Sequence, residues 1–268
     1  MPKTILITGS TDGIGLATAK NLAVQGHHIL LHGRSAEKLA QAKETLTALA
    51  NEDQITSYQA DLSNLSDVAA FAKDIAENHS QLDVLINNAG VYKTPNTTTK
   101  DGLDIRFAVN TLAPYLLTKH LLPTLGSKGR VINLSSAAQS TVDPAALKGE
   151  TQLSDSDAYS QSKLALTMWS RIMGEAQKEN GPVIIAVNPG SFLASKMVKE
   201  AYGMEGNDLN VGADILIRAA LNNEFADASG RYFDNDQGQF ADPHPDALDL
   251  SKSQKVTEAI EFMLTKLV

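Results

Sequence analysis

The sequence predicts an α/β protein: a single doubly wound domain in which helices flank a parallel sheet of about seven strands. Short apolar runs alternate with longer segments of helical period along most of the chain, which is typical of βαβ units. The 268 residues suit one α/β domain, and no linker or repeat divides them, so residues 1–268 are expected to form one unit. With 43% hydrophobic and 20% charged residues, the chain can bury a large core without disulfides.

The predicted strands are spread evenly along the chain. Each is a short apolar run, as expected for strands that are covered on both faces of a parallel sheet. The longer segments between them are expected to be helices. The strands are predicted at residues 4–8, 28–32, 55–59, 84–87, 131–134, 183–187 and 231–233.

Three further segments are interpreted by their pattern and length. Segments 137–154 and 189–207 follow predicted strands and exceed ordinary loop length, so they are the expected substrate loops. Residues 234–246 are interpreted as a surface connection before the last helix. Within the helix predicted between residues 154 and 178, an apolar stripe indicates core or a subunit interface: Ala165, Met168, Trp169, Ile172 and Met173.

Composition excludes several classes of function. Lys plus Arg number 23 and Asp plus Glu number 31, so the net charge is −8 and binding to a nucleic acid is not expected. The absence of cysteine removes thiol and iron–sulfur chemistry, so any redox reaction needs a bound cofactor. No apolar run approaches the ~20 residues that span a membrane, and the N-terminus has no leader-like pattern, so a cytoplasmic protein is expected.

A glycine-rich turn follows the first predicted strand and opens a helix. Gly9 permits a tight turn, Gly13 a close approach of a pyrophosphate, and Gly15 close packing of the helix on the strand. The N-terminus of the helix then directs its N–H groups at the phosphates. The alternative is an ordinary turn between a strand and a helix. The candidate cofactor-binding residues of this turn are Gly9, Ser10, Asp12, Gly13, Ile14 and Gly15.

The Thr-Gly-x-x-x-Gly-x-Gly spacing of residues 8–15 resembles that of the short-chain dehydrogenase/reductase family, and further motifs occur in that family's order. The resemblance runs from Thr4 to Val268, and the residues before Tyr159 and the stretch 230–233 look most like its retinol-dehydrogenase-like branch. It implies a Rossmann-type fold and an NAD(P)-dependent oxidoreductase. The further motifs are Asn87-Asn88-Ala89-Gly90, Asn110, Ser135-Ser136, Tyr159-x-x-x-Lys163 and Asn188-Pro189-Gly190.

Tyr159 and Lys163 are four residues apart, so on a helix they lie within reach of each other. A nearby ammonium favours the phenolate and lowers a tyrosine pKa of ~10 by ~1–3, toward working pH. Tyr159 is therefore the predicted general acid/base. The resemblance selects Ser136 rather than Ser135 as the serine that hydrogen-bonds the substrate oxygen. It also implies that Lys163 holds the nicotinamide ribose.

Asn110 precedes Pro114 by four residues, and proline has no N–H to bond the carbonyl of residue 110. Within a helix predicted over residues 103–122, that carbonyl is left free to accept a water. The resemblance implies a chain of waters from Asn110 through Lys163 to solvent, which restores the tyrosine proton. The alternative is a simple proline kink in a surface helix.

The end of the second predicted strand bears on the choice between NAD and NADP. No acidic residue stands there to bind a ribose 2′-hydroxyl, whereas Arg34 offers a guanidinium to a 2′-phosphate. NADP(H) is therefore preferred. NAD(H) is the alternative, because Asp12 would repel a 2′-phosphate if its carboxylate faced inward. The resemblance assigns Asp61 and Leu62 to the adenine.

The nicotinamide end shows a departure from the family pattern. Relatives commonly carry a threonine four residues beyond Gly190 to bind the carboxamide, and this chain has Ala194 followed by Ser195. Ser195, after a shift of one residue, or the backbone near Phe192 would have to make that contact. The residues that the resemblance places against the rest of the cofactor are Asn88, Ala89, Gly90 and Pro189.

No catalytic metal is predicted. His28 and His32 have the spacing of helical zinc ligands, but four residues of a strand span ~13 Å, which is too far for one ion with bonds of ~2 Å. The six histidines are interpreted as surface or strand-edge residues.

These observations predict an oxidoreductase that transfers a hydride between NADP(H) and a small-molecule carbonyl or alcohol. The alternatives are a non-catalytic NADP(H)-sensing regulatory protein and an NAD-dependent alcohol dehydrogenase on the same fold. Because the helices of Asn110 and Tyr159 often pair between subunits in the family, a homodimer or homotetramer is expected. An apolar substrate is indicated by four residues of the second loop: Phe192, Leu193, Met197 and Tyr202.

Overall fold

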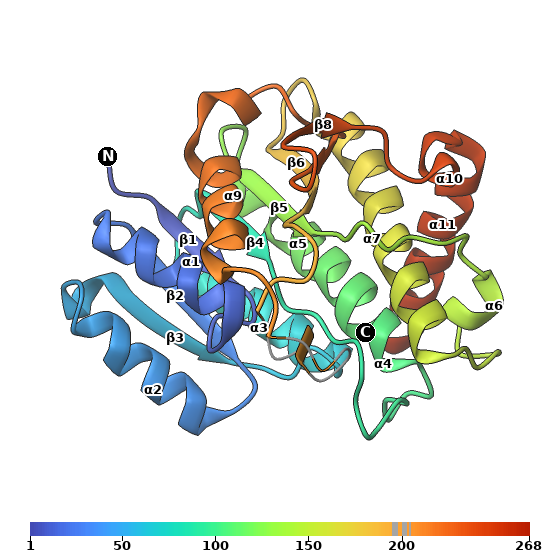
Figure 1. The fold of residues 1–268 in the computed structure, drawn as a ribbon, viewed down its shortest axis with the longest axis horizontal. Coiled ribbons are helices and arrows are strands. Elements are labelled where there is room, and N and C mark those ends of the chain that lie inside the picture. The colour runs from blue at the N-terminus through green and yellow to red at the C-terminus, as the bar shows by residue number, and fades with distance from the viewer. Residues whose placement is uncertain (195–197, 200–202, 204) are drawn as a thin grey trace.

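The computed structural model describes residues 1–194, 198–199, 203 and 205–268. Its strands form one sheet in the order β3-β2-β1-β4-β5-β6-β7-β8 (Figure 1). Pairing from β1 to β7 is parallel, and β8 runs antiparallel to β7 at the edge. The predicted doubly wound α/β class is thus confirmed. The strands are β1 (Thr4–Ile7), β2 (His28–Gly33), β3 (Ile55–Gln59), β4 (Val84–Asn87), β5 (Arg130–Leu134), β6 (Val183–Asn188), β7 (Tyr232–Asp234) and β8 (Gln239–Ala241).

Helices cover both faces of the sheet (Figure 1). One face carries α1 (Gly13–Val24), α2 (Ala36–Thr47) and α9 (Leu209–Leu221). The other carries α3 (Leu65–Asn78), α5 (Ala113–Leu125) and α7 (Asp155–Gln177), with α11 (Leu250–Leu267) packed against α7. The shorter helical segments are η1 (Glu52–Gln54), α4 (Ile105–Phe107), η2 (Ala108–Leu112), α6 (Pro144–Leu147), η3 (Asn223–Phe225) and α10 (Pro245–Leu248). None of the described helices combines the length and the hydrophobicity that a bilayer crossing requires.

Side chains alternate between the two faces along each strand, so the sheet contributes to a separate hydrophobic cluster on each face. Leu6, Leu85 and Val131 pack with residues of α3, α5 and α7. Their neighbours Ile7 and Ile86 pack with residues of α1, α2 and α9. Successive side chains of a strand point to opposite faces, so each central strand supplies both cores and consists almost entirely of apolar residues.

The eighth strand differs from the sequence prediction. The segment 234–246, interpreted above as a surface connection, contains β8, which forms a hairpin with β7. Gly238 has a φ of +67° in the turn between them, a conformation that favours glycine. Phe240 of β8 packs on Phe225 and Phe233, with ring centroids 5.2 and 5.1 Å apart. A strand of three residues with one large apolar side chain shows no period, so the sequence pattern did not indicate it.

The helix predicted over residues 103–122 has an irregular start. It begins as α4, widens to a π-helical turn at η2 and continues as α5 to Leu125. In the turn, the N–H of Ala113 donates to the carbonyl of Ala108, five residues earlier. The change of register falls where Pro114 lacks the N–H that an α-helix would use to bond residue 110. Proline therefore predicts the irregularity but not its π-helical form.

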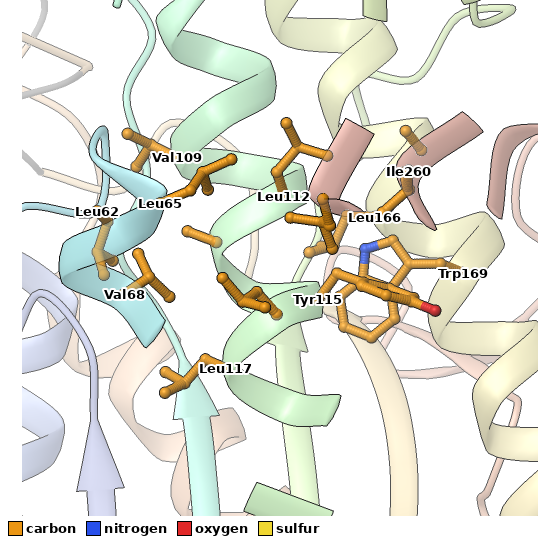
Figure 2. Packing of buried hydrophobic residues seen from close by; sticks show 14 of the residues in the cluster. Leu62, Leu65, Val68, Val109, Leu112, Tyr115, Leu117, Leu166, Trp169 and Ile260 are labelled. Atoms are coloured by element: carbon orange, nitrogen blue, oxygen red, sulfur yellow. The ribbon is translucent and has the colours of Figure 1, made fainter. Parts of the chain in front are cut away.

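The apolar stripe on α7 packs against the protein's own C-terminal helix. Met168 and Trp169 are buried in a cluster that also contains Ile260 of α11 (Figure 2). The Trp169 indole stands edge-on to the ring of Tyr115 on α5, with centroids 5.3 Å apart. Its buried Nε1 has no hydrogen-bond partner among the described residues. Ala165, Met168 and Trp169 of the stripe therefore belong to the core and Met173 packs against it, whereas Ile172 is not part of this cluster.

A polar contact fastens α11 to α5 beside this cluster. The Tyr115 hydroxyl donates to the carboxylate of Glu261, and Lys119 Nζ lies 2.7 Å from the same carboxylate. Burial, followed by the Glu261 charge, raises the pKa of Tyr115 above its usual range. The phenol therefore stays protonated and acts as a donor.

Tyr115→Phe should destabilise the protein without affecting its activity. It removes a hydrogen bond to a charged group, which is worth about 1.5–3 kcal/mol. For a chain of this size we expect a loss of about 3–10 °C in Tm, measured by thermal unfolding followed by circular dichroism. An unchanged Tm would contradict the assignment of this contact as a fastening of α11.

Candidate active site

Two adjoining cavities lie at the carboxyl ends of the parallel strands. The larger cavity, about 380 Å³, extends from the glycine turn after β1 and the end of β2 to Tyr159 and Lys163 on α7. The smaller cavity, about 180 Å³, lies between Ser136 and the turn after β6. Tyr159 lines both. Ligands of open α/β sheets bind at this edge, so the cavities are the candidate active site.

The glycine turn is packed tightly against the end of β4. Gly9 has a φ of +63°, and a Cβ there would also lie 2.9 Å from the backbone of Ala89. A Cβ on Gly15 would lie 2.4 Å from both the Gly9 carbonyl oxygen and the Asn88 amide nitrogen. That amide donates to the carbonyls of Thr8 and Gly9 at 2.9 and 3.0 Å. The turn therefore tolerates no side chain at Gly9 or Gly15.

Most of the predicted cofactor residues line the larger cavity, but three do not. The Ser10 hydroxyl instead accepts the backbone N–H of His32 at 2.9 Å and is buried against β2. Gly15 is buried where α1 meets the turn, and Phe192 lines the smaller cavity. The predicted residues that do line the larger cavity are Gly9, Asp12, Gly13, Ile14, Arg34, Asp61, Leu62, Asn88, Ala89, Gly90, Tyr159, Lys163 and Pro189.

Two cations stand at the end of the larger cavity that follows β2. Arg34 and Lys38 both line it. Asp12 caps α1 by accepting the N–H of Gly13 at 2.8 Å, and its carboxylate lies 3.7 Å from Lys38 Nζ. The ammonium of Lys38 thus offsets the negative charge of Asp12, which would repel the 2′-phosphate of NADP. Lys38 was not among the predicted site residues, although its place four residues after Arg34 was an available signal.

Lys163 stands one helical turn from Tyr159, with its Nζ 5.7 Å from the centre of the Tyr159 ring. The lysine is 4% exposed and donates to the Leu134 carbonyl, at the end of β5, at 2.7 Å. Burial lowers the pKa of Lys163 to about 8, so the ammonium form prevails at neutral pH. Tyr92 stacks edge-on against Tyr159, with ring centroids 5.0 Å apart. The site therefore holds a cation beside a partly enclosed phenol.

The two serines at the end of β5 have different environments. The Ser135 hydroxyl is buried and lies 2.6 Å from the hydroxyl of Thr167 on α7. Both serines line the smaller cavity, but within the described part of the chain the Oγ of Ser136 accepts only the N–H of Ala138, at 3.1 Å, which leaves its O–H as a donor. Tyr232 of β7 fixes the main chain here by donating to the Ser136 carbonyl at 3.2 Å. The geometry favours Ser136 as the residue that faces a substrate.

Asn110 lies in η2, where it is buried and makes hydrogen bonds to residues beside the larger cavity. Its Oδ1 accepts the N–H of Val91 at 2.8 Å, and its Nδ2 donates to the Val91 carbonyl at 2.9 Å. The same Nδ2 donates to the Ser162 hydroxyl at 3.0 Å. Val91 lines the larger cavity and Ser162 precedes Lys163 in the chain. The amide therefore links the loop after β4 to α7 beside the lysine.

The turn after β6 is clamped by the β7–β8 hairpin. Asp236 accepts hydrogen bonds from the N–H and hydroxyl of Ser191, at 2.8 and 2.6 Å, and from the Asn188 amide at 2.8 Å. The next residue, Phe192, has a φ of +52°, which is rare for a bulky side chain. Asp236 was not among the predicted site residues, because the hairpin that carries it was not predicted.

The walls of the smaller cavity are mostly apolar. Ile14, Tyr92 and Leu193 line it, and no charged side chain is among its described lining residues. The predicted substrate loops both contribute: segment 137–154 supplies Ala137 and Ala138, and segment 189–207 supplies residues 189–193 and 198. The contacts expected of Ser195, Met197 and Tyr202 lie outside the described residues.

His32 corrects the interpretation of the histidines as surface residues. It is 3% exposed on β2, its ring stacks on Phe71 with centroids 4.9 Å apart, and its Nδ1 accepts the N–H of Gly9 at 3.1 Å. Burial lowers the pKa of His32 to about 4, so the ring is neutral at ordinary pH. His28, on the same strand, is exposed. Across the part of the chain that the structure describes, no cluster of three or more His, Asp or Glu side chains is arranged to hold a metal ion.

The fold and the cavities together define an oxidoreductase that uses a nicotinamide dinucleotide. A family model described as short chain dehydrogenase matches residues 3–206. The chain belongs to the short-chain dehydrogenase/reductase family, whose members are NAD(P)-dependent oxidoreductases.

Individual relatives agree with this assignment. Human retinol dehydrogenase 13 is 32% identical over 251 residues, which cover 87% of this chain and 76% of that protein. The crystal structure of an uncharacterized protein from Mycobacterium paratuberculosis has a TM-score of 0.80 at 26% identity, covering 98% of this chain and 93% of its own. A metagenomic short-chain oxidoreductase in complex with NADP has a TM-score of 0.61 at 28% identity, covering 81% and 90%. The predicted resemblance to the retinol-dehydrogenase-like branch is confirmed.

His32 should make the protein less stable in acid. Its pKa is about 4 in the folded protein and 6.5 in the absence of burial. Between these pH values the unfolded chain binds a proton that the folded protein does not, so the free energy of unfolding decreases as the pH falls. From neutral pH to about pH 4, His32 should lower the free energy of unfolding by about 3 kcal/mol.

Urea unfolding at neutral pH and at about pH 4 measures this effect. On acidification, the free energy of unfolding of His32→Asn should decrease by about 3 kcal/mol less than that of the wild type. His28→Asn, a change of an exposed histidine on the same strand, is the matched control and should follow the wild type. Equal decreases in the free energy of unfolding of the wild type and His32→Asn would refute the lowered pKa of His32.

Proposed function

We propose that this protein is a carbonyl reductase or alcohol dehydrogenase that exchanges a hydride between NADP(H) and a small apolar substrate. The observation that carries the proposal is the position of Tyr159, which lines both the larger and the smaller cavity. A phenol at this junction can reach a group that reacts between the two cavities. Lys163 Nζ lies 5.7 Å from the centre of the Tyr159 ring, and Ser136 lines the smaller cavity together with Tyr159.

The larger cavity suits a dinucleotide along its whole length. One end carries Arg34 and Lys38, the middle is formed by the backbone of the glycine turn, and the other end reaches Tyr159 and Lys163. Backbone N–H groups at the start of a helix favour phosphates. When bound, the nicotinamide supplies a hydride donor or acceptor.

Tyr159 is the proton donor in the proposed reduction. Its O–H gives a proton to the carbonyl oxygen of the substrate, which becomes the hydroxyl of the product, and in oxidation the phenolate takes that proton back. The Lys163 ammonium stabilises the phenolate that is left. Oγ of Ser136 accepts the N–H of Ala138, so its O–H remains available to donate to the same substrate oxygen. Asn110 holds α7 and the loop after β4 in register, and so positions Lys163.

NADP(H) is the preferred cofactor in this proposal. The guanidinium of Arg34 and the ammonium of Lys38 both border the cavity end where a 2′-phosphate would lie, and Lys38 also pairs with Asp12. Asp12 and Asp61 also line the cavity, so the preference rests on the position of the two cations at the end of β2 and not on a net charge. NAD(H) lacks the phosphate and would gain little from this pair.

An apolar substrate is favoured by the smaller cavity. Its walls carry Tyr92, Phe192 and Leu193, and Phe192 is 47% exposed, so it can still cover a bound molecule. Burying apolar surface of the substrate against these side chains is worth about 25 cal/mol per Å². Retinol dehydrogenase 13 acts, by its name, on an alcohol of this apolar kind.

The proposed assembly is a homodimer or homotetramer that forms through a surface other than the α7 stripe. Within one chain, α11 already packs on that stripe, and Tyr115 of α5 bonds Glu261 of α11. Pairing of subunits through that stripe would require α11 to leave.

Tyr159→Phe tests the catalytic assignment. Removing the phenolic proton should lower kcat/KM for NADPH-dependent carbonyl reduction about 10²- to 10⁴-fold, measured as NADPH oxidation over a panel of apolar aldehydes and ketones. NADPH binding should be retained. Tyr115→Phe, which removes a hydroxyl at a residue that lines neither cavity, is the control and should keep wild-type turnover. Undiminished turnover in Tyr159→Phe would defeat the proposal, as would wild-type protein that binds NADPH tightly but reduces no carbonyl.

Arg34→Ala combined with Lys38→Ala tests the cofactor preference. Loss of two charge-assisted contacts should raise KM for NADPH about 10- to 100-fold and leave KM for NADH almost unchanged. Lys178→Ala, at an exposed lysine near the end of α7, should change neither value. An equal rise for both nucleotides would contradict a role in recognising the 2′-phosphate.

A further inference from the structure

His32 joins the two walls of the larger cavity at the end proposed for adenosine. Its Nδ1 accepts the N–H of Gly9, in the glycine turn, at 3.1 Å. Its Nε2 lies 3.2 Å from the carbonyl oxygen of Ala60, at the end of β3. Because Nδ1 accepts a hydrogen bond, the ring proton must be on Nε2, which then donates to Ala60. Gly9, His32 and Ala60 all line the cavity.

The backbone of His32 strengthens the same connection. Its N–H donates to the Ser10 hydroxyl at 2.9 Å, and its carbonyl accepts the N–H of Ser10 at 3.0 Å. The ring lies against Phe71 of α3, with an angle of 29° between the planes, which fixes its orientation. One residue thus contacts the glycine turn, the end of β3 and α3.

We propose that His32 is a positioning residue of the nucleotide site, which sets the distance between the glycine turn and the Ala60–Leu62 turn so that the adenosine half of the cofactor fits between them. This inference rests on the proposed function. The two hydrogen bonds end on backbone groups that form the cavity wall, so their loss changes the shape of the binding site itself. A site held in its binding geometry before the ligand arrives avoids the cost of ordering it.

The neutral ring is required for this bridge. A protonated imidazole has N–H donors at both nitrogens, and the Gly9 N–H would then face a second donor. Burial keeps the pKa of His32 at about 4, against the opposing effects of the Ala60 carbonyl and the Asp61 charge. The ring therefore bridges an N–H and a carbonyl with no change in its state at ordinary pH.

Three variants separate the two hydrogen bonds from ring packing. His32→Phe keeps an aromatic ring against Phe71 but has neither bond. His32→Asn keeps a short acceptor for the Gly9 N–H and loses the reach to Ala60. His28→Phe is the matched control, because His28 is an exposed residue of the same strand.

Binding of ADP and NADPH to the purified protein, measured by isothermal titration calorimetry, is the decisive readout. His32→Phe should raise Kd for both ligands about tenfold or more, since ADP contains the adenosine half of the cofactor. His32→Asn should recover part of that loss. At saturating NADPH, kcat and the KM of the carbonyl substrate should stay within about threefold of the wild type, because the reacting end is not altered.

Each outcome decides the matter. A folded His32→Phe protein with wild-type Kd values would overturn the proposal, and so would a loss of kcat with unchanged nucleotide binding. If His32→Phe does not fold, His32→Asn takes its place, and wild-type affinity for ADP in that variant would overturn the proposal. Wild-type protein that binds neither ADP nor NADPH would refute the proposed function itself, whereas equal binding by the wild type and His32→Phe refutes only the role of His32.

Discussion

The common direction of seven strands is the constraint on which the site depends. Because β1 to β7 are parallel, the segments that follow them emerge at one edge of the sheet, where the glycine turn, Ser136 and the Pro189 turn meet although the chain separates them widely. Tyr159 and Lys163 come from α7. The bond from Lys163 to the Leu134 carbonyl ties this helix to the end of β5, so the helix and the sheet are held together at the candidate site.

Periodicity and motif order were enough to predict the fold class and most strands. The central strands are apolar on both faces, and β3 and β4 begin and end at the predicted residues. β8 escaped prediction because it has three residues and its stability comes from contacts of Phe240 with Phe225 and Phe233, which no local pattern reveals. Pro114 marked the irregular helix but not its π-helical form.

The residues of the candidate site also fall into those that could be predicted from the sequence and those that could not. Tyr159 and Lys163 could be predicted as a pair because they are four residues apart in the chain, and Gly9 because its turn directly follows the first strand. Asp236 acts on Ser191, which is 45 residues away in sequence, and His32 acts on Ala60, which is 28 residues away. Such pairs depend on which strands become neighbours. Ser10 shows the converse, since its motif position does not bring its hydroxyl into the cavity.

Trp169 gives the protein an internal optical probe. It is the sole tryptophan of the chain, so the indole emission comes from one place, the junction of α5, α7 and α11. An indole that is fully buried, packed edge-on to a tyrosine ring and without a hydrogen-bond partner among the described residues emits at short wavelength. Detachment of the C-terminal helix would admit water to this ring and shift the emission to the red, even while the distant nucleotide cavity kept its shape.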